Sequence, residues 1–380
     1  MIRSRTQLSA RTIAAALGVA FVASGARAAS FTPLGVLEGD VSSHPVAISG
    51  DGSTIVGTSR SASGSQRAFI WDRVHGMRAL FDPAAEVGSA ARDITADGST
   101  VFALLGDRFV LWDEAGGPRS LDIGFAPSLM SADGSTFAGR SGDSTVVWDA
   151  ENGIRDLGQL PGGNAPDALR ISADGSTIVG RALTDRGEEA FVWTAASGIQ
   201  AIGESPGSAG FFPGSAIGVS GDGSTVVGGR LPEVGREAFV WDAENGMMGL
   251  GDLPPGVGEF LSIATDVSAD GSTVVGVGGT GTFVWDEERG LRDLDVVLAS
   301  LGLDLDGWIL DQLVFGESMP RISADGRTII GTGLFQGRPT AYIAVIPEPS
   351  TALLFGLGLI ALATAPRAPS DRACPPAARP

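Results

Sequence analysis

Few residues of this 380-residue chain belong to the types that usually perform chemistry. It contains two histidines, His44 and His75, and a single cysteine, Cys374, close to its C-terminus. Because metal sites in proteins are often built from several His and Cys side chains, these counts argue against a transition-metal centre. We expect both histidines to be solvated, since His44 precedes a predicted strand and His75 lies in a tight turn.

One short stretch resembles the turn that exposes a catalytic serine. Residues 203–207 read Gly-Glu-Ser-Pro-Gly, the Gly-x-Ser-x-Gly pattern of a nucleophile elbow, with Ser205 at its centre. The stretch occupies the place of Gly158-Gln-Leu-Pro-Gly162 in an earlier copy of a recurring unit. We therefore interpret it as a repeat variant and predict no catalytic residue here.

Carboxylates are abundant, with 44 Asp and Glu residues in all. Paired acids could cleave glycosidic bonds, but chance pairs are expected among so many, and none stands out from the repeat. Asp304-Leu-Asp306-Gly307 is similar to part of a calcium loop and lacks its third Asp and distal Glu. We predict no cofactor and keep a structural calcium as an open alternative.

A pattern of the form Ile-Ser-Gly-Asp-Gly-Ser-Thr-Ile-Val-Gly recurs seven times. The spacing between its turn aspartates ranges from 36 to 55 residues, and such repetition indicates an architecture of stacked units. The turn aspartates are Asp51, Asp97, Asp133, Asp174, Asp222, Asp270 and Asp325.

Each unit has the pattern of a four-stranded antiparallel meander. In residues 168–203, two β-rich runs flank Asp174-Gly175, a strong hairpin signal, and a polar loop over 182–189 leads to a third and a fourth strand. The seventh unit lacks a fourth strand, whereas an unmatched strand, Thr32–Gly35, precedes the first unit. We therefore predict a seven-bladed β-propeller closed by the N-terminal strand, with a linear β-solenoid as the competing fold.

Tryptophan marks the third strand of the units. Six of the seven Trp residues occupy this one position, which indicates packing between neighbouring sheets. The exception is Trp308, in an insertion between Asp293 and Met319. We expect this insertion to form a short helix over 296–301, capped by Asp295, and an extra strand within 303–310. It should plug the channel or cover the closure seam.

Recognition is expected on the face that carries the variable loops between second and third strands and between units. The candidate ligand-binding residues there are the adjacent aromatics Phe211 and Phe212, and two arginines in neighbouring loops, Arg186 and Arg236. Exposed aromatics could stack on sugars, although burial beneath the loop is an equal alternative.

The two ends of the chain read as export signals. Residues 1–28 have a basic start, an apolar stretch and a small-x-small site ending at Ala28, typical of a signal peptide cut by signal peptidase. The remaining domain is assigned to residues 29–346 and the C-terminal segment to 347–380. In that segment Pro347-Glu348-Pro349 precedes an apolar run over 351–365 and scattered arginines.

This C-terminal segment resembles the PEP-CTERM sorting signal of Gram-negative bacteria. The resemblance implies a transient membrane helix over 351–365, processing by an exosortase near Pro347, Glu348 and Pro349, and an address at the cell surface or in the extracellular matrix. The units, with strands such as Phe-Val-Trp-Asp, also resemble the HAF-type extracellular repeat. That family implies a fold and a location, and no established activity.

The net charge of the chain limits the classes of partner that it can bind. The chain has a formal net charge of −18; the first 27 residues contribute four positive charges and the residues after 350 two more, so residues 28–350 carry −24. Such a surface repels nucleic acid. We predict an exported, non-catalytic propeller that binds or scaffolds exopolysaccharide or surface proteins. The alternative is a glycoside hydrolase or lyase acting on extracellular polysaccharide.

Overall fold

The recurring Asp-Gly pairs form the turns between the first and second strands of each sheet. In a computed structural model, which describes residues 28–82, 87–203, 214–231, 235–251, 253, 260–279, 281–310 and 319–347, the glycine of each pair has a φ between +68° and +76°. Only glycine adopts this conformation without strain. The preceding Asp closes the turn: Asp51 Oδ1 accepts hydrogen bonds from Ser49 Oγ at 2.8 Å and from the Ser53 N–H at 2.9 Å.

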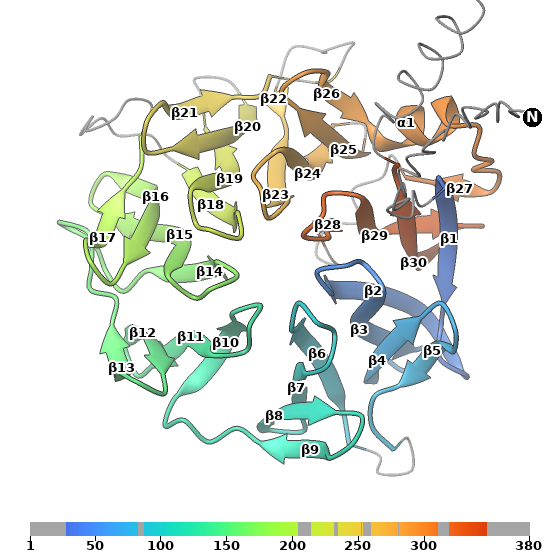
Figure 1. Cartoon of the computed structure of the whole chain (residues 1–380), viewed down its shortest axis with the longest axis horizontal. Coiled ribbons are helices and arrows are strands. Elements are labelled where there is room, and N and C mark those ends of the chain that lie inside the picture. The colour runs from blue at the N-terminus through green and yellow to red at the C-terminus, as the bar shows by residue number, and fades with distance from the viewer. Residues whose placement is uncertain are drawn as a thin grey trace, which may run out of the picture.

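These turns organise seven antiparallel sheets in a ring, which confirms the predicted seven-bladed propeller (Figure 1). Blades one to three consist of β2 (Asp40–Ile48), β3 (Thr54–Ser61), β4 (Gln66–Asp72) and β5 (Gly76–Ala79); β6 (Ser89–Ile94), β7 (Val101–Leu105), β8 (Arg108–Asp113) and β9 (Gly117–Ser120); and β10 (Ala126–Met130), β11 (Thr136–Ser141), β12 (Ser144–Asp149) and β13 (Gly153–Asp156). Blades four to six consist of β14 (Asp167–Ile171), β15 (Thr177–Thr184), β16 (Gly187–Thr194) and β17 (Gly198–Ala201); β18 (Gly214–Val219), β19 (Thr225–Arg230), β20 (Gly235–Asp242) and β21 (Gly246–Gly249); and β23 (Ile263–Val267), β24 (Thr273–Gly278), β25 (Gly281–Asp286) and β26 (Gly290–Asp293).

Blade seven joins the two ends of the described chain. It contains β28 (Arg321–Ile322), β29 (Thr328–Phe335), β30 (Arg338–Val345) and, as its outer strand, β1 (Ser30–Gly35). β1 pairs antiparallel with β30, placing Thr32 opposite Ile343. The N-terminal strand therefore closes the ring as predicted, and Figure 1 shows the two strands side by side.

The predicted polar loop over 182–189 is wrong. β15 and β16 continue through it, with Leu183 opposite Glu188 and Thr184 opposite Gly187, so that only two residues remain in the turn. Alternating burial along β15 explains the extension, because Ala182 and Thr184 are buried while Leu183 is exposed. The second strand thus continues as a half-buried hairpin arm. An additional short strand, β22 (Phe260–Leu261), pairs in parallel with β20.

The recurring tryptophans pack in the apolar layers, as predicted. Each of the six belongs to or packs against one of the hydrophobic clusters. Trp193, 5% exposed, lies in a cluster with Val147 and Leu157 of the preceding blade and Ile178 of its own. Burying such a large side chain between sheets stabilises the ring of blades.

The insertion in blade seven covers the closure seam. Its helix, α1 (Leu294–Ser300), begins two residues earlier than predicted and is preceded by Asp293, not Asp295. The extra strand is short: β27 (Trp308–Ile309) pairs with β29. The Trp308 ring lies 5.0 Å from that of Phe31 in β1 and 5.1 Å from that of Phe335, which locates it over the seam. Within the described ranges no helix is long and apolar enough to span a membrane, and segment 351–365 lies outside them.

Candidate functional site

The Asp-Gly turns meet around one end of the central channel. Backbone N–H groups of one turn donate to the carbonyl of the next: Gly50 to Ala96 at 2.8 Å, Ala96 to Ala132 at 2.7 Å, and Gly221 to Ala269 at 3.0 Å. The position before each Asp is Gly or Ala because the turns approach closely; a Cβ on Gly221 would lie 3.0 Å from that of Ala269. This hydrogen-bonded ring fixes the inner strands in place.

The turn carboxylates are engaged within their own turns. Hydrogen bonds from the Thr95 hydroxyl and from Ser99 lower the pKa of Asp97. The pKa values of Asp133, Asp174, Asp222 and Asp270 are lowered as well, so these turn acids act as structural acceptors.

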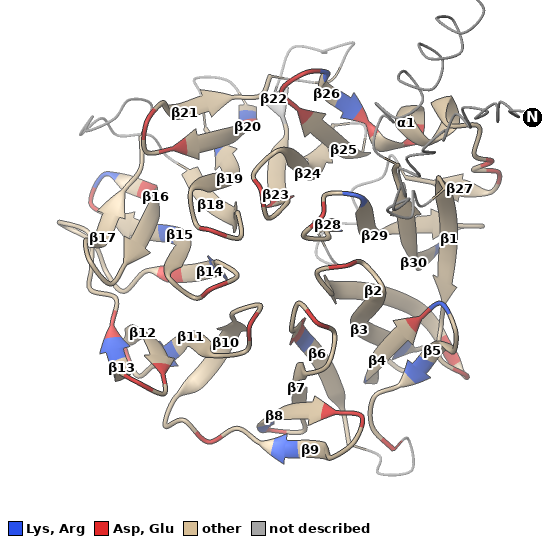
Figure 2. Ribbon diagram, in the orientation of Figure 1, with Lys and Arg blue, Asp and Glu red and all other residues tan. Residues whose placement is uncertain are grey.

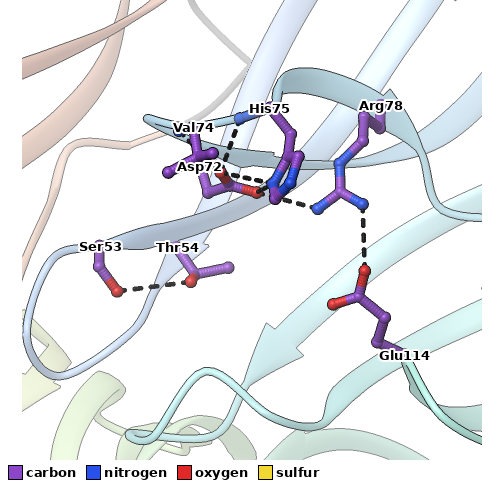
Figure 3. Close-up of polar contacts among 7 residues, drawn as sticks. All are labelled: Ser53, Thr54, Asp72, Val74, His75, Arg78 and Glu114. Atoms are coloured by element: carbon purple, nitrogen blue, oxygen red, sulfur yellow. Dashed lines mark hydrogen bonds and ion pairs between the residues drawn. The ribbon is translucent and has the colours of Figure 1, made fainter.

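A second acidic turn, which follows five of the six recurring Trp residues, is also structural (Figure 3). Partial desolvation opposes ionisation of Asp72, but hydrogen bonds from His75, Val74 and Arg78 outweigh it and lower its pKa to about 2. Arg78 also reaches Glu114 of the next blade at 3.3 Å. His75 is exposed, as predicted, and its Nδ1 lies 3.0 Å from Asp72 Oδ2.

The six longer inner strands are irregular near their ends, and β2 has a second register shift near its start. Six inner strands show a register shift just before their last residues. A β-bulge of this kind re-aims side chains and is common beside functional sites. The residue that follows the bulge differs from blade to blade, and in chain order, with its equivalent in blade seven, it is Ala47, Asp93, Leu129, Arg170, Gly218, Asp266 and Arg321.

Several of these residues line a cavity of about 300 Å³ in the channel. The cavity lies among the inner strands of blades one to four and β28 of blade seven. Its charged lining consists of Arg60, Arg92, Asp93, Arg170 and Arg321. The volume is at the lower end of the ~300–1,000 Å³ typical of small-molecule sites. A cavity with convergent polar groups is the main candidate for function in the described part of the chain.

Blades five and six contribute no lining because their inner strands approach each other. Gly218, at the equivalent position in β18, has its neighbour so close that a Cβ would lie 3.0 Å from the Asp266 Cα. The two inner strands therefore lie in close contact at this level, and the cavity is lined by residues of the other blades.

The two acids after the bulges have perturbed pKa values. Desolvation raises the pKa of Asp93 to about 6, and the negative charge of Asp266 adds to the rise, while Arg170 and the N–H of Ile94 oppose it. Desolvation also raises the pKa of Asp266, opposed by Arg170 and by the N–H of Ile322. The positive charge of Arg170 therefore opposes the rise in the pKa of both carboxyls, and Asp93 titrates close to neutral pH.

Asp266 and Arg321 additionally connect blades six and seven. The Ile322 N–H donates to Asp266 Oδ2 at 3.1 Å, and Arg321 Nη1 donates to the Thr265 carbonyl at 3.0 Å. Since β28 has only two residues, these bonds compensate for its short ladder. Arg170 differs: among the described residues, its Nε and Nη2 are buried without a hydrogen-bond partner.

Sequence reasoning missed this cluster because the repeat drew attention to its constant positions. Asp93 and Asp266 do share one column of the repeat, contrary to our interpretation that no acidic pair stands out. Comparing the units column by column, two residues before the turn Ser or Thr, would have found them. The prediction that His44 is solvated is wrong: it lies in β2, 2% exposed, beside the cavity.

Of the predicted ligand-binding residues, neither Arg186 nor Arg236 lines this cavity. Phe211 and Phe212 lie outside the described residues, as does Ser205. Arg186 lies in the tight β15–β16 turn and pairs with buried Glu189 at 2.9 Å. Arg236 is half-buried in β20, where its carbonyl accepts from the Ser262 N–H. Their predicted roles in binding remain predictions.

The predictions on metals and on the processing sites stay predictions. No group of three or more His, Cys, Asp or Glu suited to a metal is found in the described ranges. Asp304 instead accepts a hydrogen bond from the Asp306 N–H at 2.9 Å. Ala28 is exposed at the start of the described chain, and Pro347 follows β30, whereas Glu348 and Pro349 lie outside the description.

The C-terminal segment matches a known family model. Residues 345–368 match the model described as the PEP-CTERM protein-sorting motif. The chain carries a PEP-CTERM signal. This motif implies recognition by an exosortase and identifies an exported, surface-associated protein of the Gram-negative type. The proposed HAF-type likeness has no counterpart among these matches, and no curated protein matches the chain.

Solved structures show the same fold at low identity. An oligogalacturonate lyase from Vibrio parahaemolyticus is 13% identical with a TM-score of 0.55, covering 85% of this chain and 98% of its own. An oligogalacturonate lyase in complex with manganese is 14% identical, with a TM-score of 0.54 and coverages of 85% and 97%. The extracellular domain of a one-component system from B. thetaiotaomicron is 12% identical with a TM-score of 0.50, covering 83% of the PEP-CTERM chain and 40% of its own.

Proposed function

We propose that this protein is an exported, non-catalytic propeller that binds extracellular polysaccharide or surface proteins and so scaffolds the cell-surface matrix. The observation that carries the proposal is the cavity of about 300 Å³ among the inner strands, lined by side chains that differ between blades. Side chains that vary between blades on a common backbone frame are what a binding site on a rigid scaffold requires.

The sorting motif supports this location of action. A protein with a PEP-CTERM signal at residues 345–368 is exported, and its ligand is therefore sought outside the cell. The acidic surface, with −24 on residues 28–350, favours solubility there. Figure 2 shows acidic residues in turns around the ring and the arginines at fewer, separate positions.

The test is co-sedimentation of residues 29–346 with extracellular polymer from an exosortase-bearing producer. Half of the polymer is treated with protease and half with periodate, which oxidises sugars. Saturable binding lost only after periodate indicates a polysaccharide ligand, and binding lost only after protease indicates a protein ligand. Absence of binding to the untreated polymer contradicts the proposal.

An enzyme is the second candidate, favoured by one observation. Asp93 has a pKa raised to about 6 inside the cavity, and an acid that titrates near neutrality suits general acid–base catalysis. Two neighbours of similar fold bear the name oligogalacturonate lyase, which makes polyuronate an appropriate first substrate to assay. Product formation measured by mass, lost in Asp93→Asn while binding persists, would establish this alternative.

A further inference from the structure

The charge of the channel cavity is opposite to that of the molecule. Residues 28–350 carry a net −24, yet the cavity lining includes four arginines and a single carboxylate, Asp93. In a cleft with low-dielectric walls, an excess of one sign of charge focuses the electrostatic potential and attracts ligands of the other sign. The cavity is thus a local exception within an acidic protein.

Two of the cavity's arginines have donors available to a ligand. Arg170 has buried Nε and Nη2 atoms with no hydrogen-bond partner within the described ranges, and Arg92, in the bulge of β6, is exposed. Arg321, in contrast, is committed to the Thr265 carbonyl. Buried guanidinium N–H groups without an acceptor are costly, and a bound anion would satisfy them.

The neighbouring carboxylates do not supply that partner. Asp93 accepts from the N–H of Ile94 at 2.9 Å, and Asp266 accepts from the N–H of Ile322 at 3.1 Å. Burial raises the pKa of both carboxyls, against the opposing charge of Arg170. The bidentate acceptor that a guanidinium fork prefers is a carboxylate, sulfate or phosphate oxygen pair.

We infer that the cavity binds an oxyanion group on a small ligand, with Arg92 and Arg170 as its partners. This inference rests on the proposed function: in an extracellular polysaccharide the group is the carboxylate of an acidic sugar or the sulfate of a sulfated one. The cavity volume suits one or a few such residues at a chain end and not a continuous polymer.

Acidity strengthens binding in this arrangement. Asp93 is faced by Arg92 on its own strand, Arg170 on β14, Asp266 on β23 and Arg321 on β28, with His44 and Arg60 of blade one also lining the cavity. Protonating Asp93 removes the negative charge nearest the oxyanion. Affinity is therefore expected to rise about 3–10-fold from pH 8 to pH 5, and Asp93→Asn removes the part of this change that Asp93 causes.

The experiment is calorimetric titration of residues 29–346, the span that contains all seven blades, with glucuronate, glucose 6-sulfate and glucose at low salt. Binding of either charged sugar and not of glucose is expected, and the first two arms separate the two oxyanion sources. Arg170→Gln and Arg92→Gln should each weaken binding at least tenfold. Arg119→Gln is the matched control, because Arg119 lies on the outer strand β9, 61% exposed and paired with Asp113 at 3.3 Å.

Two results overturn the inference: equal binding of glucose and the charged sugars, or unchanged affinity in both cavity variants at unchanged melting temperature. Should Arg170→Gln fail to fold, the exposed Arg92 still provides the test. The proposed function fails separately. If the protein co-sediments with a neutral polymer but does not bind the charged sugars, the proposed function stands and this inference is overturned. If it binds the charged sugars but no polymer, this inference stands and the proposed function is overturned.

Discussion

At the scale of single residues, the chemistry of this propeller depends on where a carboxylate lies relative to the channel. The turn acid Asp97 accepts several hydrogen bonds, which lower its pKa, whereas burial raises the pKa of Asp93 to about 6. The same side chain is a structural acceptor in one place and a near-neutral titrating group in the other. The direction of the pKa shift depends on whether hydrogen bonds to the carboxylate outweigh its desolvation.

Asp93→Asn is expected to stabilise the unliganded protein at pH 8 by about 1–3 kcal/mol and to change little at pH 4. The folded-state pKa of about 6 lies above the unfolded value of 3.8, so the folded state retains a proton that the unfolded chain releases. Stability due to this group therefore falls as pH rises from 4 to 6. An Asn oxygen can still accept from the N–H of Ile94.

Urea unfolding of the variant and the parent across pH 4–8 measures this difference. Asp97→Asn is the control, because its pKa is lowered in the folded state and the loss of an ionised acceptor should destabilise at pH 8. A stability difference for Asp93→Asn that is the same at pH 4 and pH 8 would contradict the assignment.

At the scale of elements, the Asp-Gly turns both reverse the chain and link the blades. The glycine in each turn needs a positive φ and also faces a threonine of the adjacent blade in the ring, as Gly223 faces Thr177 and Gly52 faces Thr328. Turn conformation and blade spacing therefore depend on the same residue. This explains why the pattern is so constant across seven units that otherwise vary in loop length.

Gly223→Ala is expected to destabilise the protein by about 2–4 kcal/mol, from φ strain together with overlap with the Thr177 side chain. Gly198→Ala is the matched control. Gly198 has a similar φ of +65° but no heavy atom within 4 Å of an added Cβ, so it reports φ strain alone, about 1 kcal/mol. Equal melting temperatures for the two variants would exclude a steric role for this turn between blades.

At the scale of the whole molecule, stability depends on closing the ring. β1 pairs with β30 along five register positions, and Trp308 packs on Phe31 over the seam. Without β1, the β30 edge would present unpaired backbone groups to solvent, a template for pairing with another chain. Closure therefore protects an exported protein from association as well as stabilising it.

Removing residues 29–36 is expected to lower the melting temperature of the 37–346 span and to produce concentration-dependent oligomers on size-exclusion chromatography. A synthetic peptide of residues 29–36 should restore part of the lost stability by occupying the vacant edge, and a peptide with Phe31→Ala should restore less. An unchanged melting temperature and a monomeric profile after the deletion would show that β1 does not close the ring.

The architecture could be predicted from local sequence signals. Asp-Gly turns, β-branched strands and one Trp column indicate a repeated meander, and the missing fourth strand at one end with an extra one at the other indicates closure. These are local signals, repeated seven times, so errors in single units average out. The C-terminal signal could also be recognised from the sequence, because Pro347-Glu348-Pro349 and the apolar run belong to a linear sorting motif.

The proximity of the charged residues from different blades became apparent only in the tertiary structure. Asp93, Arg170 and Asp266 come from three blades and are separated by about 80 to 100 residues in sequence, so their proximity depends on how the blades are arranged. The structure likewise extended β15 and β16 through an expected loop and buried His44. Turns follow from the conformational preferences of adjacent residues, whereas desolvation and Coulomb interactions depend on distances that are fixed only when the ring closes.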